Sequence, residues 1–143
     1  MDITAAEILI FPVEQLPVLG TYPEFEDVPE DRPISVYSLN EIATEKIVAL
    51  QDRARNEPRD LYDLWFLTSH AGVDIGHLIG PIRENYAFGR KILLASKTAF
   101  SQKEARLMAL WNGRLGHQME ALPQYDEVFR TIRRALRQAG FPQ

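Results

Sequence analysis

One lysine stands in the middle of an expected apolar helix face, and it is the first residue of this sequence that points to chemistry. At about 100° per residue, Lys46 falls four residues from both Ile42 and Leu50, on the stripe that should pack into the core. An unpaired buried charge is very costly. The side chain of Lys46 must therefore extend until its amine reaches solvent, or the amine must pair with a carboxylate or meet an anionic ligand. Arg53, seven residues later, lies close to the same line.

Two aspartates are the candidate partners of this lysine. Asp60 and Asp63 are three residues apart, so their side chains share a helix face about 60° wide. Such a pair can hold a divalent cation, position a polar group or neutralise a basic partner. An acid near a helix start, as Asp60 is, also stabilises the helix through its dipole. Arg59 can grip a phosphate or a carboxylate, or can simply lie on the surface.

Two consecutive helices must bring these residues together. Ser38 precedes Glu41 by three residues, which is the spacing of a capping box, and the apolar stripe predicts a helix from there to about Arg55. Residues 56–58, Asn-Glu-Pro, then break the chain, and Pro58 suits the first turn of a second helix over about 58–70. The lysine therefore belongs to the first helix and the aspartates to the second.

The remaining patterns predict a mainly helical α+β fold, as a single domain over residues 1–143. Residues 1–37 form the lead-in, with strands expected at 2–11 and at 34–37 and an irregular stretch, rich in proline and acids, at 12–33. Residues 38–143 form a bundle of about five or six helices. Ser101 and Glu104 repeat the capping-box spacing. After a turn at 71–74, further helices are expected over 75–88, 90–100, 101–111 and 124–139.

Composition excludes several classes of protein. The chain has no cysteine, which excludes disulfide scaffolds and cysteine-ligated zinc or iron–sulfur sites. No apolar run approaches a membrane span and the start does not look like a secretory signal, so we expect a cytoplasmic protein with no membrane contact. The net charge of −4 is unevenly spread: residues 1–52 carry 11 acids and two bases, and residues 53–143 carry nine acids and 14 bases.

Residues 37–67, YSLNEIATEKIVALQDRARNEPRDLYDLWFL, resemble a known family signature. The segment is similar to that of the AbiEii/AbiGii-type nucleotidyltransferase toxins, the toxin half of a bacterial type IV toxin–antitoxin family linked to abortive infection. The likeness lies in E-K followed by an alanine and a leucine, an arginine seven residues past the lysine, and then R-D-x-Y-D-L. The matching positions are Glu45, Lys46, Ala49, Leu50, Arg53, Arg59, Asp60, Tyr62, Asp63 and Leu64.

The resemblance implies a nucleotidyltransferase-like fold whose C-terminal part is helical. Such an enzyme transfers a nucleotide from a nucleoside triphosphate to an acceptor, which is an RNA for some related toxins. By position, the resemblance makes Lys46 the contact to the triphosphate and Asp60 the acid of the active site, both as catalytic residues, with Arg53, Arg59 and Asp63 binding the nucleotide or supporting them. Mg²⁺ and a nucleoside triphosphate are implied for the complete enzyme, and a cognate antitoxin and an RNA acceptor are the implied partners.

Two motifs of that family do not occur in the 143 residues. There is neither a Gly-Ser turn nor an Asp-x-Asp pair for Mg²⁺, and metal-dependent transfer needs those carboxylates. We therefore expect a C-terminal portion of such an enzyme that is inactive alone, with a missing N-terminal half supplied in trans. Asp2 is the candidate metal ligand on that alignment. The alternative is a non-enzymatic helical interaction module or a truncated relative that lost the chemistry, and an exposed strand edge would favour oligomers.

The last expected helix adds a further charged surface. Its apolar side is opposed by a row of arginines that can either track an RNA backbone or form a solvated face. The row consists of Arg130, Arg133, Arg134 and Arg137. The three histidines lack the spacing of metal ligands, and Trp65, Trp111 and Phe129 are expected in the core rather than as a platform for stacking bases.

Overall fold

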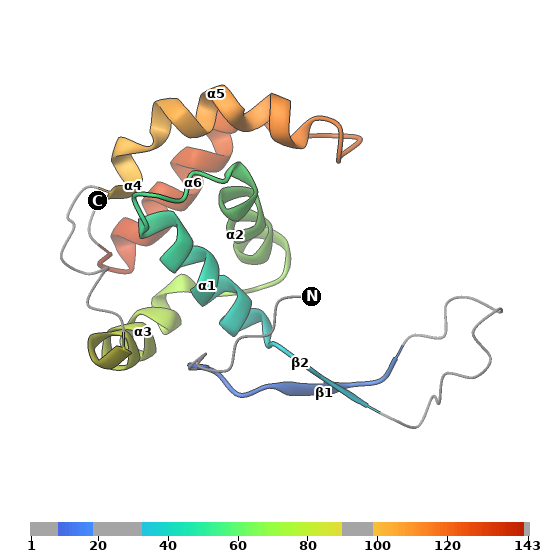
Figure 1. Ribbon diagram of the computed structural model, residues 1–143, viewed down its shortest axis with the longest axis vertical. Helices are drawn as coiled ribbons and strands as arrows, with labels where there is room; N and C mark the ends of the chain where they lie inside the picture. The colour runs from blue at the N-terminus through green and yellow to red at the C-terminus, as the bar shows by residue number, and fades with distance from the viewer. Residues whose placement is uncertain (1–8, 19–32, 90–98, 142–143) are drawn as a thin grey trace.

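Helices dominate the computed structural model, with a two-stranded hairpin beside them (Figure 1). The structure describes residues 9–18, 33–89 and 99–141. The strands are β1 (Glu14–Leu16) and β2 (Ile34–Val36). The helices are α1 (Leu39–Gln51), α2 (Pro58–His70), α3 (Ile75–Gly89), α4 (Ala99–Gln102), α5 (Glu104–Leu115) and α6 (Tyr125–Gln138). The fold is α+β and mainly helical, as the sequence predicts.

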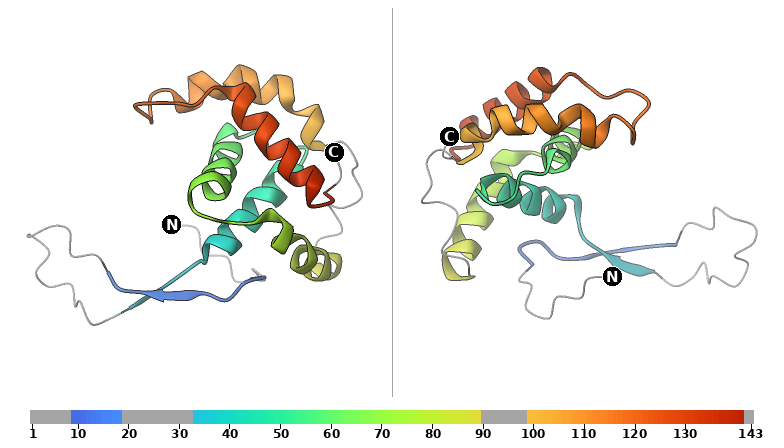
Figure 2. Two further views of the ribbon diagram at one scale, coloured as in Figure 1. Left: turned by 180° about the vertical axis from the view of Figure 1, so that it is seen from behind. Right: turned by 45° about the horizontal axis from the view of Figure 1, so that its top comes forward.

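The two strands form an antiparallel hairpin in which Leu16 lies opposite Ile34. The strand predicted at 34–37 is confirmed, whereas the one predicted at 2–11 is wrong where it can be compared, because residues 9–11 are not in a strand. Residues 1–8, which include Asp2, lie outside the described residues. β1 instead lies between Pro12 and Pro17. Proline has no backbone N–H to donate, and a short edge strand tolerates it because its flanking residues need no hydrogen bond to the partner strand. Both views in Figure 2 show the hairpin extending away from the helices.

A buried carboxylate ties the N-terminal segment to α1. Glu41 is 1% exposed, and its Oε2 accepts hydrogen bonds from the backbone N–H groups of Ile10 (3.1 Å) and Phe11 (2.8 Å). Only half of the predicted capping box forms, because Ser38 Oγ accepts from the Glu41 N–H at 3.2 Å while the Glu41 carboxylate binds the N-terminal segment. Two amide donors satisfy a buried charge better than the one donor that a capping box offers.

We expect Glu41→Ala to detach residues 10–11 from α1. The substitution removes the acceptor of two hydrogen bonds, so the free energy of unfolding should fall by about 1–3 kcal/mol. Hydrogen exchange of the Ile10 and Phe11 amides should become fast, while urea unfolding gives the stability. Asn40→Ala changes an exposed neighbour on the same helix and serves as the control. Unchanged protection of both amides in Glu41→Ala would contradict the tether.

The end of α1 differs from the prediction and affects the site. The helix ends at Gln51 rather than near Arg55. Asp52 has an extended backbone, and its Oδ1 accepts a hydrogen bond from the Ala54 N–H at 2.9 Å. This local turn competes with a further helical turn, so Arg55 lies in the loop between α1 and α2. α2 spans residues 58–70, as predicted, with proline in its first turn.

Of the later helices, α4 and α5 follow the predictions less closely than α3 and α6. The capping box predicted at Ser101 and Glu104 is wrong: Lys103 immediately precedes α5, and no side chain caps that helix. α5 also continues through the Asn-Gly pair at 112–113 to Leu115, where a break was predicted, because Trp111 and Leu115 are both buried and packing outweighs the glycine. Most of the helix predicted at 90–100 lies outside the described residues.

A glycine follows α6 in a backbone conformation that other residues rarely adopt. Gly140 has a φ of +82°, and the N–H groups of Gly140 and Phe141 bond to the carbonyls of Arg137 and Leu136. These two bonds satisfy carbonyl groups that the helix end would otherwise leave unpaired. The helix lies within the predicted range of 124–139.

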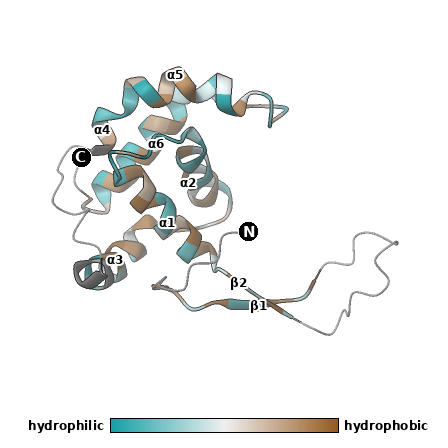
Figure 3. Cartoon of the chain, in the orientation of Figure 1, coloured by the Kyte–Doolittle hydropathy of each residue, from teal (hydrophilic) through white to brown (hydrophobic). Residues whose placement is uncertain are grey.

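α1 and α6 each pack on α2 to form the core, with α3 and α5 closing it. The apolar side predicted for α6 is confirmed, and its arginine row is exposed on the opposite side. Hydrophobic and hydrophilic residues alternate along α5 and α6 (Figure 3), as expected for helices with one buried side. The core residues from these three central helices include Ala43, Ile47, Leu50, Leu61, Leu64, Leu67, Val128, Phe129, Ile132 and Leu136.

Candidate functional site

Lys46 lies between the two aspartates of α2. Its Nζ donates a hydrogen bond to Asp60 Oδ1 at 3.1 Å and lies 2.7 Å from Asp63 Oδ2. The lysine side chain is 21% exposed, so it is neither immersed in the core nor free in solvent. Burial alone would lower the pKa of Lys46, but the hydrogen bonds to Asp63 and Asp60 outweigh it and the pKa is raised. The amine therefore remains charged at neutral pH.

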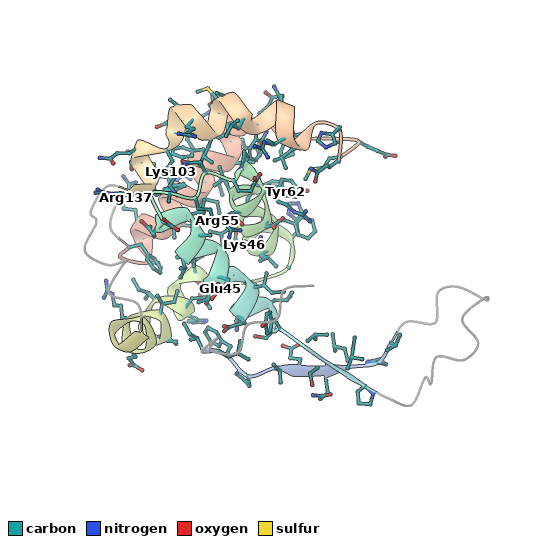
Figure 4. All side chains as sticks on the ribbon, in the orientation of Figure 1. Glu45, Lys46, Arg55, Tyr62, Lys103 and Arg137 are labelled. Carbon is teal, nitrogen blue, oxygen red and sulfur yellow. The ribbon has the colours of Figure 1, made fainter. Side chains whose placement is uncertain are left out.

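Asp60 is the most enclosed member of this group, with a side chain only 2% exposed. Besides Lys46, it binds Arg55 in a bidentate manner, with Nε to Oδ2 at 2.6 Å and Nη2 to Oδ1 at 3.0 Å. Three hydrogen bonds from two cations compensate the buried carboxylate. Asp60 thus joins α1, the loop after α1, and the first turn of α2. Figure 4 shows Lys46 and Arg55 on the same side of α1 as α2.

Sequence reasoning did not single out the arginine that binds Asp60. The ion pair is made by Arg55, whereas Arg53 is exposed in the loop, where the helical stripe predicted for it no longer applies. Arg59 lies on the outer side, 64% exposed, with its Nε 3.9 Å from Asp63 Oδ2. The missed signal was the Asp52-Arg53-Ala54 turn, since ending α1 at Gln51 would have freed Arg55 to fold back.

Lys103 is a second residue that the sequence did not single out. It is 4% exposed, and its Nζ donates to two backbone carbonyls, Arg55 O at 2.7 Å and Ala49 O at 3.3 Å. Burial lowers the pKa of Lys103 to about 8, although the charges of Asp52 and Asp60 oppose this. The amine holds the loop that carries Arg55 (Figure 4). A lysine between α4 and α5 gives no sequence signal for such burial.

Cations outnumber carboxylates in the ion-paired group around Lys46. Its ion pairs join three cations, Lys46, Arg55 and Arg59, to two carboxylates, Asp60 and Asp63, which leaves a net charge of +1. Among the described residues, no three histidine or acidic side chains are grouped as metal ligands. Asp60 and Asp63 are both occupied by cations, so these residues do not fit Mg²⁺.

Two surface depressions are described, and neither is lined by these cations or by Asp60. One depression lies between α5 and the start of α6, and a second lies between the start of α3 and the end of α6. The cationic group instead opens to solvent through its arginines, since Arg55 is 54% exposed. None of the helices in the described residues has the length and apolar character needed to cross a membrane.

The fold and this charged group define a mainly helical α+β protein with a partly buried lysine held by acids of the next helix. The family model described as nucleotidyl transferase AbiEii toxin, type IV TA system, matches residues 1–137, and the chain belongs to this family. It is thus a nucleotidyltransferase-like toxin in the general sense, and a cognate antitoxin is the partner that a toxin–antitoxin family suggests. No curated protein and no solved structure gave a significant match.

Proposed function

We propose that this chain supplies the cationic helical part of a nucleotidyltransferase that, when complete, transfers a nucleotide from a nucleoside triphosphate to an RNA acceptor. The observation that supports this proposal most strongly is that Lys46 stays charged and partly buried between Asp60 and Asp63. Phosphoryl transfer depends on positioning and on neutralising phosphate charge more than on covalent chemistry from the protein. A lysine fixed by two carboxylates meets that need because it cannot swing away from its position.

Each residue of the site has a defined task in this proposal. Lys46 has three N–H donors, of which the two aspartates use two, so the third remains for a phosphate oxygen. Asp60 and Asp63 orient the amine and do not meet the nucleotide themselves. The exposed guanidinium groups of Arg55 and Arg59 add positive charge beside it, which suits the remaining phosphates. The resemblance gave Arg53 the same supporting task, and its exposed place in the loop leaves that task open to test.

We propose that Mg²⁺ binds to residues other than Asp60 and Asp63. Mg²⁺ would supply charge neutralisation at the phosphates, but Asp60 and Asp63 already bind cations and the 143 residues contain no Asp-x-Asp. We therefore propose that these 143 residues alone are inactive and that the metal ligands of the complete enzyme lie outside them. A nucleotide-incorporation assay with an RNA acceptor should show no turnover, and turnover without a second polypeptide would contradict this part.

Nucleotide titration tests the central claim. Lys46→Met should weaken the binding of each nucleoside triphosphate at least tenfold, because a charge-assisted hydrogen bond to phosphate contributes roughly 1.5–3 kcal/mol. The measurement is calorimetric or fluorescence titration of the purified chain in the absence of metal. Arg133→Gln removes one positive charge from the exposed side of α6 and is the matched control. Equal affinity in the wild type and in Lys46→Met would show that the lysine only packs.

One observation favours a second candidate function, a non-enzymatic interaction module. Both carboxylates of the site are neutralised by cations of the same chain, as in a purely structural ion-pair network. A chain that binds no nucleotide in the titration, and that binds the cognate antitoxin instead, would have this function. Lys46 would then hold α1 against α2 and do no chemistry.

A further inference from the structure

A row of aromatic rings lies along one face of α2, beside the charged site. Tyr62, Phe66 and His70 are four residues apart, so they follow one another along the helix. The rings of Tyr62 and Phe66 are 6.3 Å apart and inclined by 24°, and those of Phe66 and His70 are 5.1 Å apart and inclined by 12°. Successive rings are therefore nearly parallel, and they form a stack that continues for two helical turns.

These rings are unusually open to solvent for aromatic side chains. Phe66 is 46% exposed and His70 is exposed, while Tyr62 is partly buried against Trp111 of α5, with 6.5 Å between ring centroids. Trp65 supports the row from the side, with its ring 4.9 Å from that of His70. The tryptophan and phenylalanine expected in the core, Trp111 and Phe129, are each 2% exposed. The exposed stack is thus made by residues other than the three considered from the sequence.

Charged side chains lie on the same face of α2. Arg59 precedes Tyr62 by one turn and is 64% exposed, and Asp63 lies between Tyr62 and Phe66 in the sequence. Lys46 at 2.7 Å and Arg59 at 3.9 Å compensate the charge of Asp63. The aromatic row therefore runs from a cationic end, where the net charge of the ion-paired group is +1, toward His70.

We propose that this face of α2 binds single-stranded nucleic acid, with unpaired bases stacking on Phe66, Tyr62 and His70 and the phosphates meeting Arg59. Exposed aromatic rings next to cations are the usual elements of single-strand binding, since every base has a face that can stack. This binding surface would hold the acceptor strand of the proposed function. Only the role of the bound strand as acceptor rests on that function.

The surroundings of the stack favour nucleic acid over a protein partner. Charged residues are depleted from the centre of protein interfaces, where aromatic anchors are surrounded by apolar side chains. Here the exposed rings alternate with Arg59, Asp63 and Ser69 on the same helix. Stacking rings combined with a net positive charge complement a polyanion that carries bases. Figure 4 shows Tyr62 on the side of α2 that faces away from α4.

Fluorescence anisotropy with labelled oligonucleotides tests the proposal directly. The probes are oligo(U) and oligo(dT) of about ten nucleotides, a typical site size, together with a duplex of the same length. Neither metal nor nucleoside triphosphate is added. The wild type should bind the single strands more tightly than the duplex, and comparison of oligo(U) with oligo(dT) decides whether RNA or DNA is preferred. Quenching of the tryptophan fluorescence provides a second reading.

Substitution of Phe66 separates stacking from charge. Phe66→Ala should weaken single-strand binding at least about fivefold, as expected when one base loses its stacking partner, while Phe66→Tyr should retain it. Leu16→Ala is the matched control, because Leu16 is 47% exposed and lies on the distant hairpin. Circular dichroism verifies the fold of each variant.

Two results would overturn the proposal. Equal affinity of the wild type and Phe66→Ala for single strands would show that the rings do not stack on bases. Absence of oligonucleotide binding, with capture of the antitoxin lost in Phe66→Ala, would make this face a protein interface. The nucleotide titration of Lys46→Met decides the proposed function independently, because either titration can fail while the other succeeds.

Discussion

Asp60→Ala should lower the free energy of unfolding by about 2–3 kcal/mol. The substitution removes a side chain that is 2% exposed and that compensates both Lys46 and Arg55. Lys46 would keep only Asp63, and Arg55 would lose both hydrogen bonds that hold it at the start of α2. We place the loss below the largest values known for broken buried pairs because Arg55 is half exposed and can be hydrated. Urea unfolding followed by circular dichroism measures the change.

Asp63→Ala is the matched control for this prediction. Asp63 binds the same lysine from the next helical turn, but its side chain is 27% exposed. Its removal should therefore cost about 1 kcal/mol or less. If the two alanine variants lost the same stability, the distinction between an enclosed and a solvated carboxylate would be wrong, and Asp60 would not be the centre of the group.

The stability of the wild type should rise with pH between about 8 and 10.5 relative to Lys103→Met. Burial lowers the pKa of Lys103 to about 8 in the folded chain, whereas an unfolded lysine retains its ordinary value near 10.5. Between these values the unfolded state binds more protons, so raising the pH favours the folded state. The groups that act on this amine are Asp52, Asp60 and Arg55. The full difference corresponds to about 3 kcal/mol.

Comparison of the two pH profiles isolates this effect. Other groups that titrate in alkali, including Tyr125, whose pKa is raised by burial, are present in both proteins and cancel in the difference. Lys103→Met also removes the hydrogen bonds to Ala49 and Arg55, so the slope with pH and not the absolute stability is the reading. Parallel profiles from pH 8 to 10.5 would mean that the lysine remains hydrated.

The sequence predicted the parts of the fold that periodicity and proline control. α2 has the predicted bounds because Pro58 starts it and the glycine after Ala71 follows its end. The pairing of Lys46 with acids of the second helix was one of three alternatives, and the geometry selected it. These features are encoded within a few residues of each other, so local patterns suffice to predict them.

The remaining features depend on contacts between distant residues. Glu41 and Lys103 are enclosed by residues about 30 and about 50 positions away, and no local pattern reports such burial. The strand at residues 14–16 exists because residues 34–36 pair with it. Arg55 was missed for a smaller reason, since the end of α1 was placed four residues too late.

The hairpin has a consequence for how this chain behaves at high concentration. Leu16 and Ile34 face each other across the two strands, yet they are 47% and 51% exposed, so within the described part of the chain no further layer covers this pair. A two-stranded sheet is marginally stable in water, and open backbone groups at its edges readily pair with other strands. At high protein concentration, copies should therefore associate through this hairpin. Repulsion between the acidic residues within 1–52 should limit that association until added salt screens it.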